Sequence, residues 1–246
     1  MRAIDYKVMA QVFATHRELG PLADESVYQQ KLLQLLKSAG MEAVTEIPVS
    51  LRFRHFCHKM AIDLVVDRKV VYELKTVAAL TAAHESQLLG YLFMLNGARG
   101  KLINVRNRSL QSRFVNAPLT KDQRRQFVFD VDQYAGDGTL SRLTQELLGD
   151  WGTGLHPAIY RRAISYCFSN GMATDQLLPM RSCGEWIGNQ RFHLLSDSVA
   201  LGVTAYKEVT DQGVREFQKL VSASPLCVMH WLNVTHHRVM LRSIRK

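Results

Sequence analysis

Cysteine is scarce in this sequence and never occurs in a close pair. The four cysteines among 246 residues are widely spaced, and no CxxC motif is present. Small disulfide-stabilised proteins and zinc ribbons both depend on regularly spaced cysteine pairs. The spacing therefore argues against a disulfide framework and against a cysteine-based zinc site. The cysteines are Cys57, Cys167, Cys183 and Cys227.

Long apolar runs and low-complexity segments are also missing. The N-terminal stretch MRAIDYKVMAQVF interrupts its apolar residues with charged ones, unlike a signal peptide or a transmembrane helix. We therefore expect a cytoplasmic protein that makes no membrane contact. A chain of 246 residues is long enough for two domains with separate cores. We place their boundary near residue 130, which gives domains 1–130 and 131–246.

The most informative segment is AIDLVVDRKVVYELKTV, residues 61–77, in which charged residues interrupt apolar runs. Valine-rich stretches on both sides of the polar residues 67–69 predict two antiparallel strands joined by a tight turn. Pairing Val66 with Val70 across that turn puts Asp63 opposite Glu73, so both side chains lie on one face of the sheet. Lys75 follows two residues later and points to the same face.

Two carboxylates facing each other on a half-buried sheet repel, and burying either one unpaired costs several kcal/mol. A divalent cation between Asp63 and Glu73, together with the ammonium of Lys75, would offset that cost. Oxygen ligands of this kind suit Mg²⁺ or Mn²⁺, which keep coordination positions open for water and phosphate. The alternative is a structural ion pair between Lys75 and one acid, with the other acid in solvent.

The next segment, TAAHESQLLGYLFMLNG at residues 81–97, predicts a helix over residues 82–95. Thr81 is suited to the N-cap position, and Asn-Gly at the end is a typical stop signal. Gln87 and Tyr91 are four residues apart and therefore share one face of the helix. An ordinary amphipathic helix with polar residues at its edge is the alternative.

The order Asp63, Glu73-x-Lys75 and Gln87-x-x-x-Tyr91 resembles the PD-(D/E)XK nuclease superfamily, particularly its RecB-like branch. The resemblance implies a mixed α/β fold of helix, three-stranded antiparallel sheet, helix and strand, with the active site at the edge of the sheet.

Residues 6 to about 115 also resemble the small bacterial GxxExxY family, through HRELGPLADESVY, AIDLVV, VYELKTV and HESQLLGYL in that order. Glu25 and Tyr28 match that family's Glu and Tyr, whereas Leu22 stands where its first Gly belongs.

The resemblance also implies a role for each site residue. Asp63, Glu73 and the backbone carbonyl of Leu74 would bind the metal, and Lys75 would orient or activate the attacking water. The remaining residues would complete the site as follows: Gln87 and Tyr91 would position the scissile strand, and Glu25 would complete the acidic pocket.

The second half of the chain resembles the first at an offset near 130 residues, which indicates an internal repeat. ESVYQQKLLQLLKSAG aligns with PAIYRRAISYCFSNG, so Tyr28 falls on Tyr160. In this alignment the catalytic positions are lost, and we expect a second nuclease-like unit without the active site. The aligned replacements are Pro157 at Glu25, His193 at Asp63, Val203 at Glu73, Ala205 at Lys75 and, less clearly, Gln218 at Gln87.

The net charge of +9 is concentrated between residues 99 and 125, where Asp122 is the sole acid. A basic stripe of that kind would neutralise phosphates and give salt-dependent affinity for nucleic acid. An ordinary solvated basic surface is the alternative. The residues are Arg99, Lys101, Arg106, Arg108, Arg113, Lys121, Arg124 and Arg125.

These features predict a Mg²⁺- or Mn²⁺-dependent nuclease that hydrolyses nucleic acid, with DNA favoured over RNA. Two alternatives stay open because fold and motif do not guarantee turnover. One is a catalytically idle nucleic-acid-binding or scaffold protein. The other is a nuclease subunit that depends on a protein partner, and a homodimer is also compatible with the sequence.

Overall fold

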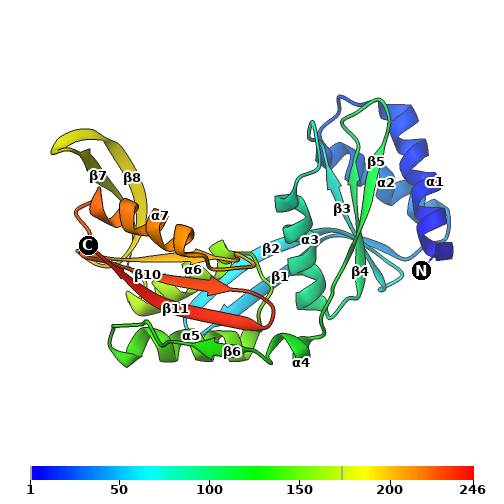
Figure 1. Ribbon diagram of the computed structural model, residues 1–246. Coiled ribbons are helices and arrows are strands. Elements are labelled where there is room, and N and C mark those ends of the chain that lie inside the picture. Colours follow the sequence, from blue (N-terminus) through cyan, green and yellow to red (C-terminus); the bar gives the residue numbers. More distant parts are fainter. Residues whose placement is uncertain (1, 173) are drawn as a thin grey trace. The chain divides into compact units, whose positions relative to one another are not determined.

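The computed structural model describes residues 2–172 and 174–246 and has a mixed α/β fold, as predicted (Figure 1). The chain forms two compact units, each built on one mixed sheet. The first unit comprises the residues up to Leu51 together with Lys59–Thr120, and the second comprises Arg52–His58 and Lys121–Lys246. No helix within the described residues is both long enough and apolar enough to cross a membrane.

The first unit places two helices before its sheet and a third between two parallel strands. The helix predicted over 82–95 has those bounds. In chain order the elements are α1 (Arg2–Leu19), α2 (Glu25–Ser38), β1 (Ala43–Phe53), β2 (Phe56–Val66), β3 (Val70–Lys75), α3 (Ala82–Leu95), β4 (Arg99–Asn104) and β5 (Gln111–Asn116).

The strands of the first sheet lie in the order β1-β2-β3-β4-β5. β2 and β3 are antiparallel with Val66 opposite Val70, the pairing that the sequence predicted. β3 and β4 are parallel because α3 carries the chain back across the sheet. β5 then returns antiparallel to β4.

Apolar side chains cover both faces of this sheet. Val12 of α1 and Leu32 of α2 are buried against one face with Tyr72 and Leu74 of β3. Leu88 of α3 is buried against the other face in a separate cluster. Alternation along β3 therefore turns its odd-numbered residues toward α3. Glu73 and Lys75 lie on that side.

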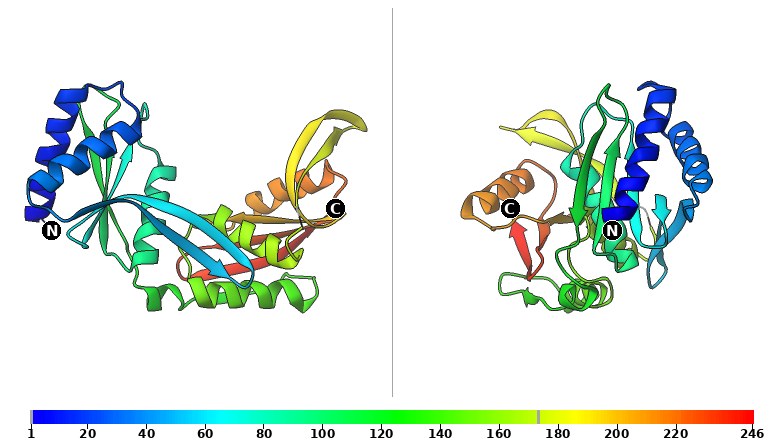
Figure 2. Two further views of the ribbon diagram at one scale, coloured as in Figure 1. Left: turned by 180° about the vertical axis from the view of Figure 1, so that it is seen from behind. Right: turned by 90° about the vertical axis from the view of Figure 1, so that its right-hand side faces the viewer.

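The β1–β2 hairpin, drawn in cyan in Figure 2, has a tip that belongs to the second unit. Phe53 and Phe56 flank the turn, and their rings lie 6.2 Å from the ring of Trp151. Trp151 Nε1 donates a hydrogen bond of 2.9 Å to the carbonyl of Arg52. The division of the chain thus differs from one cut near residue 130, because residues 52–58 and 121–130 also belong to the second unit.

The second unit has a six-stranded sheet in the order β6-β11-β10-β9-β8-β7. β9 and β10 are parallel, and β10 and β11 are antiparallel. The elements are α4 (Lys121–Arg124), β6 (Val128–Asp130), α5 (Gly138–Trp151), α6 (Pro157–Phe168), β7 (Asp175–Ser182), β8 (Glu185–Ser196), β9 (Val199–Thr204), α7 (Asp211–Ser222), β10 (Val228–Val234) and β11 (Arg238–Arg245).

From α5 onward the second unit repeats the element order of the first, which is two helices, three strands, a helix and two strands. A local detail recurs where the parallel strands end. The Asn104 side chain accepts a hydrogen bond from the N–H of Val77 and donates one to its carbonyl. Asn233 makes the same pair of bonds with Tyr206.

A second detail recurs at the first two helices. Tyr28 of α2 donates its hydroxyl hydrogen to the carbonyl of Gly20, which follows the end of α1. Tyr160 of α6 bonds the carbonyl of Gly152 at 2.6 Å, and Gly152 follows α5. Both glycines have positive φ, a conformation that favours glycine. The equivalence of Tyr28 and Tyr160, and with it Pro157 at Glu25, agrees with the sequence alignment.

The strand register corrects that alignment by one residue. Glu73 pairs with Leu102, two residues before Asn104, whereas Gly202 pairs with Trp231, two residues before Asn233. Gly202 therefore occupies the position of Glu73, where we had expected Val203. By the same register Thr204, and not Ala205, takes the position of Lys75, and Phe192, and not His193, takes that of Asp63.

The start positions of the helices correct the remaining aligned pair, which is the counterpart of Gln87. α3 and α7 begin after Thr81 and Thr210, which occupy equivalent N-cap positions. Counting from these caps puts Glu216, and not Gln218, at the position of Gln87.

Candidate active site

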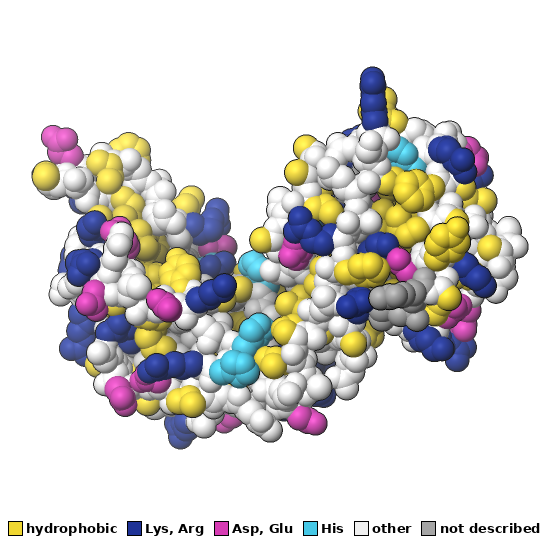
Figure 3. Space-filling view, turned by 45° about the vertical axis from the view of Figure 1, so that its right-hand side comes forward, with side chains coloured by type: hydrophobic (Ala, Val, Ile, Leu, Met, Phe, Trp, Pro, Cys, Tyr) yellow, Lys and Arg dark blue, Asp and Glu magenta, His cyan; other side chains and the backbone are white. Residues whose placement is uncertain are grey.

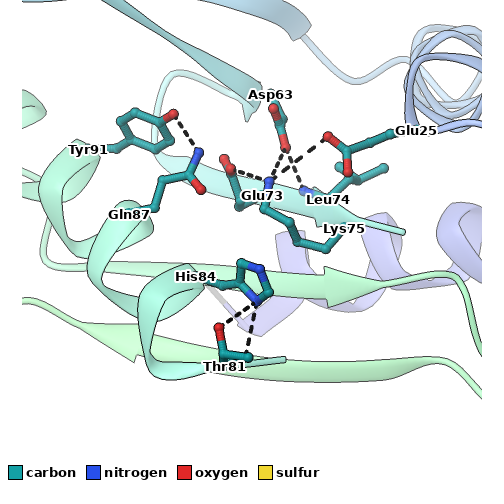
Figure 4. A network of polar contacts seen from close by, with 9 residues as sticks. All are labelled: Glu25, Asp63, Glu73, Leu74, Lys75, Thr81, His84, Gln87 and Tyr91. Carbon is teal, nitrogen blue, oxygen red and sulfur yellow. Dashed lines mark hydrogen bonds and ion pairs between the residues drawn. The ribbon is translucent and has the colours of Figure 1, made fainter. Parts of the chain in front are cut away.

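Three strand and helix segments bring four charged side chains together in the first unit (Figure 4). Lys75 Nζ lies 2.7 Å from Glu73 Oε1, 3.8 Å from Asp63 Oδ2 and 3.9 Å from Glu25 Oε1. Glu73 and Lys75 come from β3, Asp63 from β2, and Glu25 from the first turn of α2. The structure thus places the three sequence-predicted acids around one ammonium group.

The cluster is largely shielded from solvent. Glu73 is fully buried, Asp63 is 8% exposed, and the Lys75 side chain is 12% exposed. Asp63 Oδ2 also accepts a hydrogen bond of 2.8 Å from the N–H of Leu74, which orients its carboxylate. Glu73 Oε2 is buried and has no hydrogen-bond partner among the described residues. A buried carboxylate oxygen left in this state is costly unless something else binds it.

Burial disfavours the charged form of both acids in this cluster. Burial, reinforced by the charge of neighbouring Asp63, raises the pKa of Glu73 to about 8. Burial also raises the pKa of Asp63 to about 6, although Lys75 and the Leu74 N–H act in the opposite direction. For the Lys75 ammonium, burial alone would lower the pKa, but Glu73 and Asp63 outweigh it and the pKa is raised. A single lysine therefore does not neutralise this site.

The donor set fits a small divalent cation. Mg²⁺ is commonly held by one or two carboxylates while it keeps several waters. Asp63 and Glu73 supply two such carboxylates, and the unpartnered Glu73 Oε2 supplies an oxygen with no competing bond. Within the described part of the chain, no group of three or more His, Cys, Asp or Glu side chains is arranged as a complete metal site. Any cation here would consequently need the backbone, water or substrate for its remaining ligands.

Helix α3 adds a neutral polar pair beside the acids. Gln87 Nε2 donates a hydrogen bond of 2.9 Å to the hydroxyl of Tyr91, the pairing expected for residues four apart. Both side chains lie near Glu73 in Figure 4. Burial raises the pKa of Tyr91, so this hydroxyl stays protonated. His84 is occupied elsewhere, because its Nδ1 accepts a hydrogen bond of 3.0 Å from the N–H of Thr81 at the helix start.

One acid near the site was missed from the sequence. The charge of Glu46, on β1, contributes to the raised pKa of Asp63 on the neighbouring strand. Glu46 is exposed and has φ 52°, a left-handed conformation that is uncommon for a residue with a side chain. Pairing β1 with β2 at the sequence level could have identified it, since the two strands form one long hairpin.

The predicted basic stripe is divided by the fold. Lys101 is buried, with Nζ 2.8 Å from Asp5 Oδ2, and Arg124 is 2% exposed and donates to the carbonyls of Trp151 and Thr153. These two residues do not belong to an exposed basic surface, because their charges are satisfied inside the protein. The prediction was wrong for both.

The other six residues of the predicted stripe lie nearer the surface. Arg106 is half-buried and donates to the carbonyl of Thr76. Arg113 pairs with Glu85, and Arg125 donates to the carbonyl of Asp150. Arg99, Arg108 and Lys121 are exposed. On the face shown in Figure 3, basic side chains are interspersed with acidic and apolar ones and form no continuous stripe.

The first half of the chain is similar in sequence to one known family of proteins. No curated protein matches the chain with the significance required of a relative. The crystal structure of SSO0001 is similar over 47% of this chain and 68% of that chain, with 21% identity and a TM-score of 0.31. Residues 2–115, which contain the four charged side chains, match the family model of the PD-(D/E)XK nuclease superfamily.

Proposed function

We propose that this protein is a Mg²⁺- or Mn²⁺-dependent nuclease that hydrolyses phosphodiester bonds, with DNA as the favoured substrate. The observation that carries the proposal is the buried cluster of Asp63, Glu73 and Lys75, in which Glu73 Oε2 has no partner among the described residues. Burying these charges costs free energy that a purely structural role would not require. The same arrangement suits a site at which a cation and a phosphate bind side by side.

Asp63 and Glu73 would hold the cation, with the carbonyl of Leu74 as a further ligand. The Leu74 N–H already fixes Asp63, so the backbone of one residue would serve the site through both its donor and its acceptor. A bound divalent cation screens the charge of a phosphodiester and lowers the pKa of a water molecule. Glu25, 3.9 Å from Lys75, would set the negative potential at the open side of the pocket.

Lys75 would act on the attacking water. Its ammonium is held by Glu73 at 2.7 Å and keeps two further donor hydrogens that can reach a water or a phosphate oxygen. A compact cation in this position orients the nucleophile and offsets the charge that develops as the phosphorus–oxygen bond forms. Gln87 and Tyr91 would position the strand beside the acids. The exposed basic residues Arg99 and Arg108 would bind the backbone.

The decisive experiment is incubation of the full chain with single-stranded, duplex and branched DNA and with RNA, in Mg²⁺ or in EDTA. We expect cleavage of DNA in Mg²⁺, none in EDTA, and loss of cleavage in Lys75→Met. Asp67→Asn is a matched control, because Asp67 lies in the turn of the same hairpin and bonds the Glu42 N–H at 3.2 Å. Cleavage that persists in EDTA, or in the Lys75 variant, would contradict the proposal.

A second candidate is a nucleic-acid-binding protein whose acidic site is idle. The short Lys75–Glu73 contact favours it, because an ammonium at 2.7 Å already neutralises part of the cluster without a metal. Titration with Mn²⁺ distinguishes the two, since the nuclease requires saturable binding that Glu73→Ala abolishes. DNA binding without cation binding would favour the idle protein. Cleavage that appears only with a co-purified protein would favour a partner-dependent subunit.

We further propose that the second unit is a copy of the first that has lost the site. Phe192, Gly202 and Thr204 stand at the positions of the two acids and the lysine. The space is filled by Trp231, whose ring stacks on Phe217 at 4.4 Å and whose Nε1 donates to the Thr204 hydroxyl at 2.8 Å. None of these three positions carries a carboxylate, so each chain would have one active site.

Gly202 offers a direct test of this copy. A Cβ atom added to Gly202 would lie 3.3 Å from both Met229 and Phe217, so the aromatic packing leaves no room for a glutamate. Gly202→Glu should lower stability without adding a second cation site, as measured by denaturation and Mn²⁺ stoichiometry. A variant that stays stable and binds one more equivalent of Mn²⁺ would show that the pocket persists.

A further inference from the structure

The β7–β8 hairpin of the second unit carries three large apolar side chains that are more than half exposed. Trp186 is 62% exposed, Ile187 is 63% exposed and Leu177 is 57% exposed. Leu178 and Met180 of the same hairpin point the other way and pack against the core of the unit. Figure 1 shows the hairpin projecting from the rest of its unit. Clustered apolar side chains of this kind usually mark an interaction surface.

The equivalent hairpin of the first unit shows how such a tip is covered. The tip of β1–β2 packs on the helices α5 and α6, with Phe56 5.6 Å from Tyr166. Arg54 at its turn forms an ion pair of 2.5 Å with Glu146 of α5. The turns match, since Arg54 and Cys183 both have positive φ at the same place in their hairpins. A hairpin of this protein is therefore built to rest on the leading helices of a nuclease-like unit.

The leading helix of the first unit presents a complementary surface. Tyr6 is 80% exposed and Phe13 is 52% exposed, and they lie on one face of α1 with Ala10 between them. Arg17 extends the same face by one more turn and is exposed. Glu185, beside the turn of β7–β8, is also exposed, and its charge is opposite to that of Arg17. Arg54 and Glu146 are opposite in charge too, with the signs reversed.

We infer that the β7–β8 tip of one chain docks on the exposed face of α1 in a second copy of this chain. Trp186 and Ile187 would cover Tyr6 and Phe13, and Glu185 would pair with Arg17. The hairpin favours a protein partner over nucleic acid, because its charged residues Asp175, Arg181, Glu185 and Arg191 balance. The contact is a heterologous one, so it gives either a closed ring or a chain of copies.

Self-association is measured by sedimentation velocity over a range of protein concentrations. We expect the wild type to associate, and Trp186→Ser and Tyr6→Ser each to weaken association by about tenfold, the effect typical of losing an aromatic anchor. Val128→Ser is the matched control, because Val128 is 65% exposed but lies on β6. Circular dichroism checks that the variants are folded. A wild type that stays monomeric, or association that Trp186→Ser leaves unchanged, would overturn the inference.

A charge swap tests the register of the contact. Glu185→Arg and Arg17→Glu should each associate more weakly alone, and an equal mixture of the two variants should regain association. Association should return in the mixture because residue 185 of each variant then meets an opposite charge at residue 17 of the other variant. A mixture that behaves like either variant alone would contradict the proposed pairing.

A cross-link distinguishes a contact between chains from one within a chain. Cys183 is an exposed free thiol at the hairpin tip, and Ala10→Cys adds a thiol between Tyr6 and Phe13. A bifunctional maleimide should join two chains in this variant and not in its Cys183→Ser derivative. Cross-links confined to single chains, or DNA binding lost in Trp186→Ser with unchanged association, would overturn the inference.

Discussion

The two units use the same framework to hold opposite kinds of side chain. On the sheet face toward α3, the first unit buries Glu73 and Asp63 against Lys75. On the equivalent face toward α7, the second unit buries Trp231 stacked on Phe217. The asparagine and tyrosine hydrogen bonds that fix the strand ends and the leading helices are the same in both. The framework therefore does not depend on the charges, which points to a role for them other than folding.

The largest expected difference between the units is in catalysis. Asp63→Asn and Glu73→Gln should each reduce cleavage on the order of 10³-fold, because each would remove a proposed anionic ligand of the cation. Thr204→Val, at the position equivalent to Lys75, should leave the rate unchanged. Single-turnover cleavage of labelled duplex DNA measures all three. A rate that falls equally in the Thr204 variant would mean that the second unit takes part in the chemistry.

The next largest expected difference is in stability. Trp231 is fully buried, so Trp231→Ala should lower the free energy of unfolding by about 3–5 kcal/mol, the usual cost of removing a core aromatic. Mn²⁺ affinity of the folded protein should not change, because the proposed cation ligands lie in the other unit. Urea denaturation followed by tryptophan fluorescence, with Mn²⁺ titration below the transition, measures both. Loss of Mn²⁺ binding in the folded variant would show that the two units are energetically coupled.

How far the sequence could predict this structure is clearest from two elements. The bounds of α3 and the pairing of Val66 with Val70 follow from local signals, a helix cap and a tight turn, and both were predicted. The alignment of the second unit with the first was wrong by one residue, since Gly202 and not Val203 matches Glu73. β9 is apolar on both faces, so its pattern does not fix the alignment with β3 to within one residue.

The site itself was only partly predictable. The sequence placed Asp63, Glu73 and Lys75 on one face, and the structure brings them together. The burial of Lys101 could not be predicted, because its partner Asp5 lies far away in sequence on α1. Charge counting treats every lysine and arginine as exposed, and only the tertiary fold decides which of them are neutralised internally.

The cost of the acidic cluster should appear as a pH dependence that the second unit lacks. The pKa values of Asp63 and Glu73 are raised to about 6 and about 8, so the folded protein holds protons that the unfolded chain releases. In EDTA the contribution of these two acids to stability is therefore greatest at low pH and falls as pH rises through about 4 to 8. We expect the melting temperature to fall by a few °C over this range, since about 1 kcal/mol corresponds to about 2–4 °C in a chain of this size.

Glu73→Gln is the matched variant for that measurement. It removes the group whose pKa is raised most, so its melting temperature in EDTA should fall less between pH 5 and pH 8. Mg²⁺ should restore the wild type at pH 8, because the cation binds the ionised carboxylates, and should not restore the variant. Identical pH profiles for the two proteins would mean that the cluster does not carry the titration.

The smallest expected difference concerns the helix that covers each face. Gln87→Ala should slow cleavage by about tenfold, because Gln87 holds the Tyr91 hydroxyl at 2.9 Å and would position substrate without bonding the cation. Glu216→Ala, at the equivalent position of α7, should have no effect on the rate. Mn²⁺ affinity should be unchanged in both variants, which separates a positioning role from a ligand role. A Gln87 variant with weakened Mn²⁺ binding would move this side chain into the metal site itself.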